Sequence, residues 1–332
     1  MTRMQAVIRW LNTKDERSAL VKTKRRIGLI IRSVLPRWRG LSEILMRVHT
    51  MFRGPLVRCE VEGAQLWVDA RDRVIGHYLL SGYPYEQDEL DLVRKCLEPG
   101  GYFLDVGANI GYFAVLAAKH VGPSGRVVAL EPEPHNFKIL RRNIGLNGLG
   151  NVRAVNYAAV DRPQSLTLYL SSYNFGDHRI FDGDDDSLEN LGTRQNRVQV
   201  RGIALDQFLQ EERFAPDLIK IDVQGAEQSV LAGLRETLST DADIRLLMEF
   251  WPHGMRRFGT DPAELLTRLR ALGFQVFQLL SGGTLTTFSV HHLDVLQQGP
   301  REYANIFACR RPDQLDRHGI RVAPLSASST RP

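Results

Sequence analysis

A turn that contains glycine, between an apolar segment and a helical one, is the feature of the sequence with the clearest chemical meaning. Residues 103–113 read FLDVGANIGYF, which places Asp105, Gly107, Asn109 and Gly111 in close succession. Glycine lets the backbone approach a ligand closely, and a helix that begins at such a turn directs its free N–H groups toward that ligand. We expect Gly107 to give the close approach and Gly111 to permit a tight entry into the helix. The pattern predicts a nucleotide-binding turn.

Two further carboxylates follow the next expected strands. Glu131 comes 20 positions after Gly111, where a carboxylate can accept hydrogen bonds from both hydroxyls of a ribose. Asp161 follows the third strand, where it could accept from the amine of an adenine or simply occupy a turn. The predicted cofactor-binding residues are Asp105, Gly107, Asn109, Gly111, Glu131 and Asp161.

The spacing of the glycines distinguishes between two cofactors. A dinucleotide site would show GxGxxG for a pyrophosphate, whereas this turn has GxxxG preceded by Asp105. An acidic residue before the turn is unfavourable for a pyrophosphate, but it can attract a ligand that carries an ammonium and a sulfonium. The details therefore favour S-adenosylmethionine over a nicotinamide dinucleotide.

The elements that must position these residues alternate regularly after Gly101. Short apolar segments predict strands over residues 102–106, 126–130, 152–159, 218–222, 245–249, 275–279 and 305–309. Helical spacing predicts helices over residues 85–96, 112–120, 134–146, 226–238 and 262–272. We therefore expect an α/β, Rossmann-like fold with a mostly parallel, doubly wound sheet, an antiparallel edge strand, and ligands beyond the carboxyl ends of the strands.

Outside this region the sequence is less regular. Residues 1–58 are expected to be a basic helical N-terminal extension, residues 59–310 the catalytic domain, and residues 311–332 a flexible C-terminal tail. Residues 57–69 alternate as a hairpin does, and residues 171–197 form a long irregular insertion that is typical of a functional lid or of a disordered loop.

Composition limits the class of protein. No apolar run approaches the roughly 20 residues that span a bilayer, and the charged N-terminus does not resemble a secretory signal. Three cysteines without a CxxC fit neither a disulfide framework nor a zinc site. We expect a cytoplasmic protein, with contact to the inner face of a membrane as an alternative.

Charge is distributed unevenly along the chain. Residues 1–60 contain 14 Lys/Arg and 4 Asp/Glu, while the remainder contains 29 and 34. This basic head could attract an anionic membrane surface, a phosphate-bearing substrate or nucleic acid, or it could be a solvated helical arm.

Four motifs together resemble one known family. DVGANIG, the EPEPHNF that follows it, AAVD at 158–161 and IKIDVQGAE at 219–227 are similar to the FkbM-type methyltransferases, over roughly residues 80–280. The resemblance implies S-adenosylmethionine as cofactor and O-methylation of a sugar, glycan or secondary metabolite. The family commonly has Glu at the position of Gln224, so no role that requires a carboxylate there is carried over, although the amide can still hydrogen-bond.

A hydroxyl acceptor must lose its proton during methyl transfer, and two strand ends offer groups that could accept it. Asp222, with Lys220 before it, is the first choice for base or acceptor contact, although it could merely cap the next helix. Glu249 ends the following strand, and His253 after it is the second choice because imidazole titrates near neutral pH. His178 is a third candidate. No metal site is predicted, since two carboxylates on neighbouring strands are a weak signal.

Two other function classes remain open. A nucleic-acid (RNA) methyltransferase would use the basic head to bind phosphates, but the rest of the chain is acidic and contains no recognisable RNA-binding motif, so nucleic acid is an unlikely partner. A non-catalytic scaffold would not need the intact motif from Asp105 to Gly111 together with Glu131. A small-molecule or glycan acceptor with a hydroxyl is the expected partner.

Overall fold

The computed structural model describes residues 54–181, 196–240 and 242–323. The chain divides into two units, Met1–Pro55 and Leu56–Pro332. All but the last two residues of the first unit lie outside the described residues, and so do the basic helices expected there. The account below concerns the second unit.

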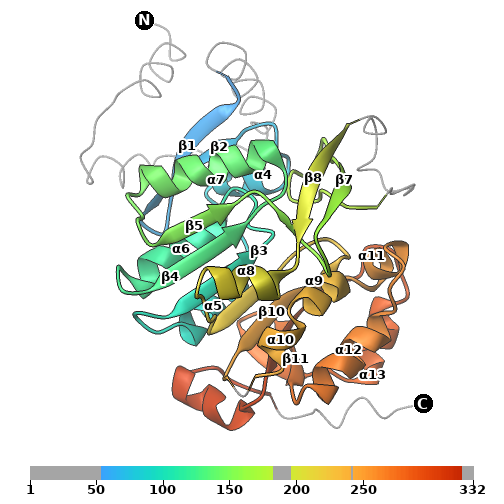
Figure 1. The fold of residues 1–332 in the computed structure, drawn as a ribbon. Coiled ribbons are helices and arrows are strands. Elements are labelled where there is room, and N and C mark those ends of the chain that lie inside the picture. The colour runs from blue at the N-terminus through green and yellow to red at the C-terminus, as the bar shows by residue number, and fades with distance from the viewer. Residues whose placement is uncertain (1–53, 182–195, 241, 324–332) are drawn as a thin grey trace, which may run out of the picture. The chain divides into compact units, whose positions relative to one another are not determined.

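An eight-stranded sheet forms the centre of this unit, in the order β12-β11-β13-β10-β9-β3-β4-β5 (Figure 1). Its strands are β3 (Tyr102–Val106), β4 (Arg126–Leu130), β5 (Val152–Val155), β9 (Leu218–Ile221), β10 (Arg245–Phe250), β11 (Gln275–Leu280), β12 (Thr284–Thr287) and β13 (Ala304–Cys309). The five strands from β5 to β10 are parallel to one another. The expected Rossmann-like sheet is confirmed.

The C-terminal end of the sheet is antiparallel. Strand β13 lies between β10 and β11 and is antiparallel to both, while β12 is the antiparallel edge strand. The sequence pattern predicted β11 and β13 as a pair at the edge, without the helix α13 (Val290–Leu296) between β12 and β13. This helix carries the chain back across the sheet, so that the last strand enters its interior.

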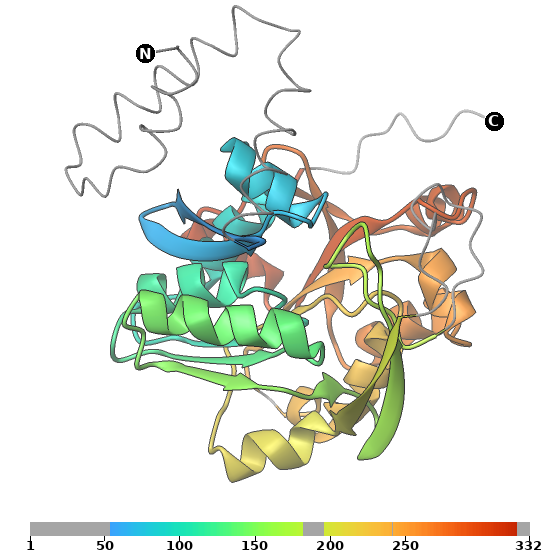
Figure 2. The same ribbon diagram turned by 90° about the horizontal axis from the view of Figure 1, so that it is seen from above.

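Helices cover both faces of the sheet because successive strand residues point to opposite sides. Phe103, Leu218 and Leu247 pack into one core with the helices α5 (Gln87–Cys96), α6 (Tyr112–Val121) and α7 (Pro134–Leu146). Leu104 and Ile219 pack into the second core, whose helices are α8 (Leu205–Glu211), α9 (Glu227–Gly233), α10 (Arg235–Leu238), α11 (Pro252–Arg257), α12 (Pro262–Ala271) and α13. Strands β3 to β5, coloured cyan to green, lie at one end of the sheet, and strands β10 to β13, coloured orange to red, lie at the other (Figure 2).

Two small sheets flank the main one. Strands β1 (Leu56–Val61) and β2 (Ala64–Asp69) form the expected hairpin, followed by helix α4 (Ile75–Ser81). Strands β6 (Ala158–Ala159), β7 (Gln164–Tyr169) and β8 (Arg197–Ile203) form a three-stranded sheet.

The single strand expected over 152–159 is divided, because the chain leaves the main sheet after β5. There the side-chain amide of Asn156 donates to the backbone oxygens of Glu131 and Pro132. The chain then enters the small sheet at β6.

The first part of the expected C-terminal tail packs against the domain. A 3₁₀ helix, η3 (Pro312–His318), buries Leu315, and Ile320 after it is fully buried. Residues 324–332 lie outside the described residues. Among the helices that the structure describes, none is both long and apolar enough to cross a bilayer.

Candidate functional site

A cavity of about 550 Å³ opens at the carboxyl ends of strands β3, β4, β9 and β10. Its wall includes the turn after β3, Glu131 after β4, Asp222 after β9 and Glu249 near the end of β10. The volume lies within the roughly 300–1,000 Å³ of small-molecule sites. The cavity is therefore at the sheet edge where a doubly wound fold binds its ligands.

The glycines of the turn after β3 permit close packing of the elements around the cavity. Gly107 has φ +87°, and a Cβ there would lie 1.9 Å from the backbone oxygen of Asp222. Gly111 has φ +85°, and a Cβ there would lie 2.5 Å from Cδ1 of Leu140 on α7. Gly107 thus brings the turns after β3 and β9 together, and Gly111 lets α6 approach α7.

Asn109 joins this turn to two other parts of the cavity wall. Its backbone N–H donates to Glu131 Oε2 at 2.7 Å, and its Nδ2 donates to the backbone oxygen of Phe175 at 3.1 Å. Its φ of +50° is unusual for a residue other than glycine. Such backbone strain is typical of functional sites.

Glu131 is a buried carboxylate at the cavity wall. Its second oxygen, Oε1, accepts from the backbone N–H of Glu133 at 2.8 Å. Burial raises the pKa of Glu131 to about 8, although both backbone hydrogen bonds favour its charged form. A carboxylate has about four acceptor positions, so each oxygen can accept a further hydrogen bond from a ligand.

Asp105 does not line the cavity, although the sequence predicted it as a ligand contact. The strand directs its side chain to the α6 face, where it lies in register with Lys220 of the neighbouring strand. Its carboxylate lies against the backbone of Ala114 on α6, and burial raises the pKa of Asp105 to about 6. The Asp105 carboxylate therefore influences Lys220 electrostatically and does not contact the cavity.

Asp161 and His253 also lie outside the cavity wall. The chain turns away from the main sheet before β7, so Asp161 lies away from the cavity. Its side chain is 37% exposed and pairs with Arg162. His253 is in the first turn of α11, with its ring 5.8 Å from the ring of Trp251. Of the predicted site residues, the structure therefore brings Gly107, Asn109, Glu131 and Asp222 together at the cavity wall.

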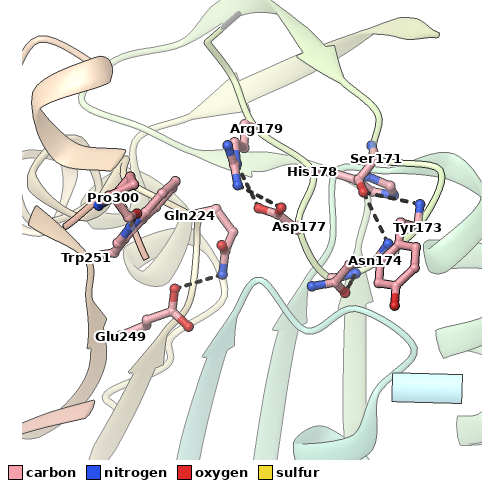
Figure 3. A network of polar contacts seen from close by, with 12 residues as sticks. Ser171, Tyr173, Asn174, Asp177, His178, Arg179, Gln224, Glu249, Trp251 and Pro300 are labelled. Atoms are coloured by element: carbon pink, nitrogen blue, oxygen red, sulfur yellow. Dashed lines mark hydrogen bonds and ion pairs between the residues drawn. The ribbon is translucent and has the colours of Figure 1, made fainter. Parts of the chain in front are cut away.

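The acceptor side of the cavity contains two carboxylates bridged by an amide. Nε2 of Gln224 donates to Asp222 Oδ1 at 2.8 Å and to Glu249 Oε1 at 3.0 Å, and Lys220 Nζ lies 3.0 Å from Asp222 Oδ2 (Figure 3 shows Gln224 and Glu249). Burial and the neighbouring Asp222, Glu227 and Glu86 carboxylates hold the pKa of Glu249 well above its usual range.

Lys220 is the cation of this group. Burial lowers its pKa, but the carboxylates of Asp222, Glu86 and Asp105 outweigh burial and hold the pKa above its usual value. Its ammonium also lies 4.5 Å from the ring centroid of Phe113. Lys220 therefore stays charged beside Asp222.

The segment 171–181 covers this side of the cavity. Arg179 pairs with Asp177 through two contacts of 2.7 Å, and its guanidinium lies 4.5 Å from the Trp251 ring centroid (Figure 3). His178 Nδ1 accepts from the backbone N–H of Ser171, so the proton of the neutral ring is on Nε2. Burial lowers the pKa of His178 to about 4. His178 can donate to a ligand, but it is poorly suited to take a proton from one.

Several cavity residues were not predicted from the sequence. Glu86 precedes α5 with φ +44°, and burial raises its pKa to about 7. Tyr303, which is 56% exposed, and Glu86 reach the wall from segments more than 200 residues apart. No local motif marks either residue, and the GDHR sequence was the one local signal for Asp177 and Arg179.

Comparison with known proteins identifies the family to which this site belongs. The sequence profile described as the methyltransferase FkbM domain matches residues 105–276, more than half of the chain. The chain belongs to the FkbM methyltransferase family. The matched region includes the turn after β3, Glu131, Asp222 and Glu249. Methyl transfer is the reaction class of this family, and S-adenosylmethionine, the cofactor expected from the sequence, is confirmed.

Individual relatives are more distant. Methyltransferase 1 of Beauveria bassiana is 30% identical over 145 residues, which are 40% of this chain and 58% of the relative. Methyltransferase sdnD of Sordaria araneosa is 28% identical over 181 residues, which are 47% of this chain and 68% of the relative. This chain thus spans little more than half the length of the first relative. An O-methyltransferase from Bacillus cereus, solved in complex with SAH, aligns at a TM-score of 0.37 and 16% identity, over 86% of this chain and 96% of that one.

The residues at the cofactor side of the cavity fit S-adenosylmethionine. Glu131 has acceptor positions left for the ribose hydroxyls, and Gly107 of the glycine turn lines the same cavity. Tyr157 and Ala158, which follow β5, line the wall next to Glu131. These residues would hold the nucleoside part of the cofactor.

Proposed function

We propose that this methyltransferase transfers the methyl group to a hydroxyl of a small molecule or glycan. The observation that supports this proposal is the pair of carboxylates, Asp222 and Glu249, on the cavity wall beside the cofactor turn. A hydroxyl is a poor nucleophile until its proton is accepted, so a site for hydroxyl acceptors needs such groups.

The position of Asp222 suits it to hold the acceptor. Its backbone oxygen lies against Gly107 of the cofactor turn, and its side chain lines the cavity. S-adenosylmethionine, when bound, supplies an electrophilic methyl group on a sulfonium. Asp222 would accept a hydrogen bond from the acceptor hydroxyl and so hold its oxygen in line with that methyl group.

The test is transfer of labelled methyl groups to matched acceptors. The panel contains sugars and hydroxylated small molecules, the same compounds with an amine in place of the hydroxyl, and transfer RNA. We expect label on hydroxyl acceptors only. Asp222→Asn should reduce kcat/KM by about 10²-fold, because a misplaced acceptor oxygen can reduce the rate by that much. Its affinity for S-adenosylhomocysteine, measured by calorimetry, should change little.

Asp161→Asn is the matched control, because it removes a carboxylate that lies outside the cavity wall. It should retain the activity of the wild type. Label on amines alone or on RNA alone would refute the hydroxyl proposal, and so would full activity of Asp222→Asn.

A further inference from the structure

We propose that Glu249 is the general base that takes the proton from the acceptor hydroxyl, and that Gln224 is the positioning residue that holds the Glu249 carboxylate at the cavity wall. This inference rests on the proposed O-methylation. It assigns separate tasks to two neighbouring carboxylates, with Asp222 orienting the hydroxyl and Glu249 accepting its proton.

The geometry of Gln224 supports a positioning role. The residue has φ +56°, and Gly225 after it packs so closely on α11 that a Cβ would lie 2.6 Å from the backbone carbon of Gly254. This packing fixes the backbone from which the amide extends. One nitrogen with two hydrogens then donates to Asp222 and Glu249 at once. An ionised carboxylate at 224 would have no hydrogen to donate to either residue.

The two carboxylates differ in their partners, and this difference assigns their tasks. Both oxygens of Asp222 have donors, namely the Lys220 ammonium and the Gln224 amide, and Lys220 is also its ion-pair partner. Glu249 accepts from the Gln224 amide and forms no ion pair among the described residues. Of the two carboxylates, Glu249 is therefore the one assigned to take the proton.

The surroundings of Glu249 add to its affinity for a proton. Its pKa is raised by burial first, and then by the carboxylates that face it, with Lys220 as the opposing charge. The ionisable groups around it are Asp222 and Lys220 from β9 and its turn, Glu227 from α9, Glu86 and Glu89 from the start of α5, and Tyr303 before β13. A more basic carboxylate is a better proton acceptor once it is ionised.

The transfer balances in atoms and electrons. The O–H bond of the acceptor breaks and the proton bonds to a Glu249 carboxylate oxygen, which becomes a neutral carboxyl group. The acceptor oxygen uses the released pair to bond the methyl carbon, and the pair of the broken carbon–sulfur bond stays with sulfur. No further co-reactant is needed.

The first experiment needs no acceptor. Protein labelled with ¹³C at the glutamate carboxyl carbons is titrated by NMR, and the signal of Glu249 is assigned by its absence in Glu249→Gln. We expect Glu249 to titrate far above the ordinary glutamate range. Gln224→Leu should raise its midpoint further, by about one pH unit, because the carboxylate loses its hydrogen-bond donor.

Gln228→Leu is the matched control, because Gln228 donates to Glu264 outside the cavity wall at 3.2 Å. It should leave the Glu249 midpoint unchanged. An ordinary midpoint for Glu249, or equal midpoints in the two leucine variants, would overturn the proposal.

Kinetics provide the second readout. With a hydroxyl acceptor from the panel, kcat of the wild type should rise with pH at the Glu249 midpoint, and this midpoint should move upward in Gln224→Leu. Glu249→Gln should lose about 10²-fold or more in kcat while its KM for the cofactor stays within about threefold. If Glu249→Gln kept its rate on a hydroxyl acceptor, O-methylation would stand and the role of Glu249 would be refuted.

Discussion

Replacing Gly107 by alanine tests whether the turn after β3 works through its close approach to Asp222. The new Cβ would lie 1.9 Å from the Asp222 backbone oxygen, where ordinary contacts begin at 3.4 Å, so the two turns must separate by about 1.5 Å. The positive φ adds about 1–2 kcal/mol, and overpacking adds about 1–3 kcal/mol. We expect unfolding free energy to fall by about 2–5 kcal/mol and Tm by roughly 4–20 °C.

The same displacement should affect catalysis more than stability. A misplacement of about 1 Å can reduce a rate by about 10²-fold, so Gly107→Ala should lose that much in kcat at a temperature at which it is fully folded. Differential scanning calorimetry and labelled methyl transfer measure the two effects on the same preparation. Circular dichroism at the assay temperature verifies that the variant is folded.

Gly319→Ala is the matched control for Gly107→Ala. Gly319 has φ +64° in the left-handed region, and a Cβ there would meet nothing within 4 Å. It should therefore show the backbone cost alone, with no loss of kcat. Equal losses of Tm in the two variants, or an unchanged kcat in Gly107→Ala, would refute the packing argument.

Three further outcomes follow from the described contacts. Burial raises the pKa of Glu131 to about 8, and the ribose hydroxyls favour its charged form. Affinity for S-adenosylhomocysteine, measured by calorimetry, should therefore rise by up to about tenfold per pH unit below pH 8 and then level off. Glu131→Gln should show a flat profile instead. Burial likewise raises the pKa of Glu227 to about 7, so the stabilisation that its neutral form gives below pH 4.5 is lost as pH rises toward 7. Glu227→Gln should flatten the fall of Tm over this range. An unchanged slope would contradict the assignment. Gln224→Glu should be less stable at pH 8 than at pH 5, relative to the wild type, because a third carboxyl group can donate to Asp222 or Glu249 only while it carries its single proton. Equal losses of Tm at both pH values would count against the bridge.

The local part of the cofactor site could be predicted from the sequence. Gly107 and Glu131 follow directly on strands whose apolar residues identify them, and Gly111 directly precedes helix α6. The chain positions of strand ends also fix which residues meet at the edge of a parallel sheet. The four motifs, read together, indicated the family before any contact was known. These signals are local, so the periodicity and spacing of residues along the chain are enough to detect them.

Residues whose role depends on direction or on distant segments could not be predicted with the same success. Asp105 is next to the turn in the chain, but the alternation of β3 turns its side chain toward Lys220 and away from the cavity. Asp161 is close to a strand end, yet the chain departs there into the small sheet. Spacing along a chain does not specify which face a side chain occupies once neighbouring strands are paired.

The amino-acid sequence by itself determined the fold class, the glycine turn after β3 with Glu131 after the next strand, and the candidate position of Asp222, because each depends on short-range patterns of apolar and glycine residues. Only the tertiary structure decided that β13 enters the sheet between β10 and β11, that Glu86 and Tyr303 join the same cavity, and that Gln224 bridges Asp222 and Glu249. These features depend on strand register and on backbone packing between segments far apart in the chain, which together set the distance and burial of each charge.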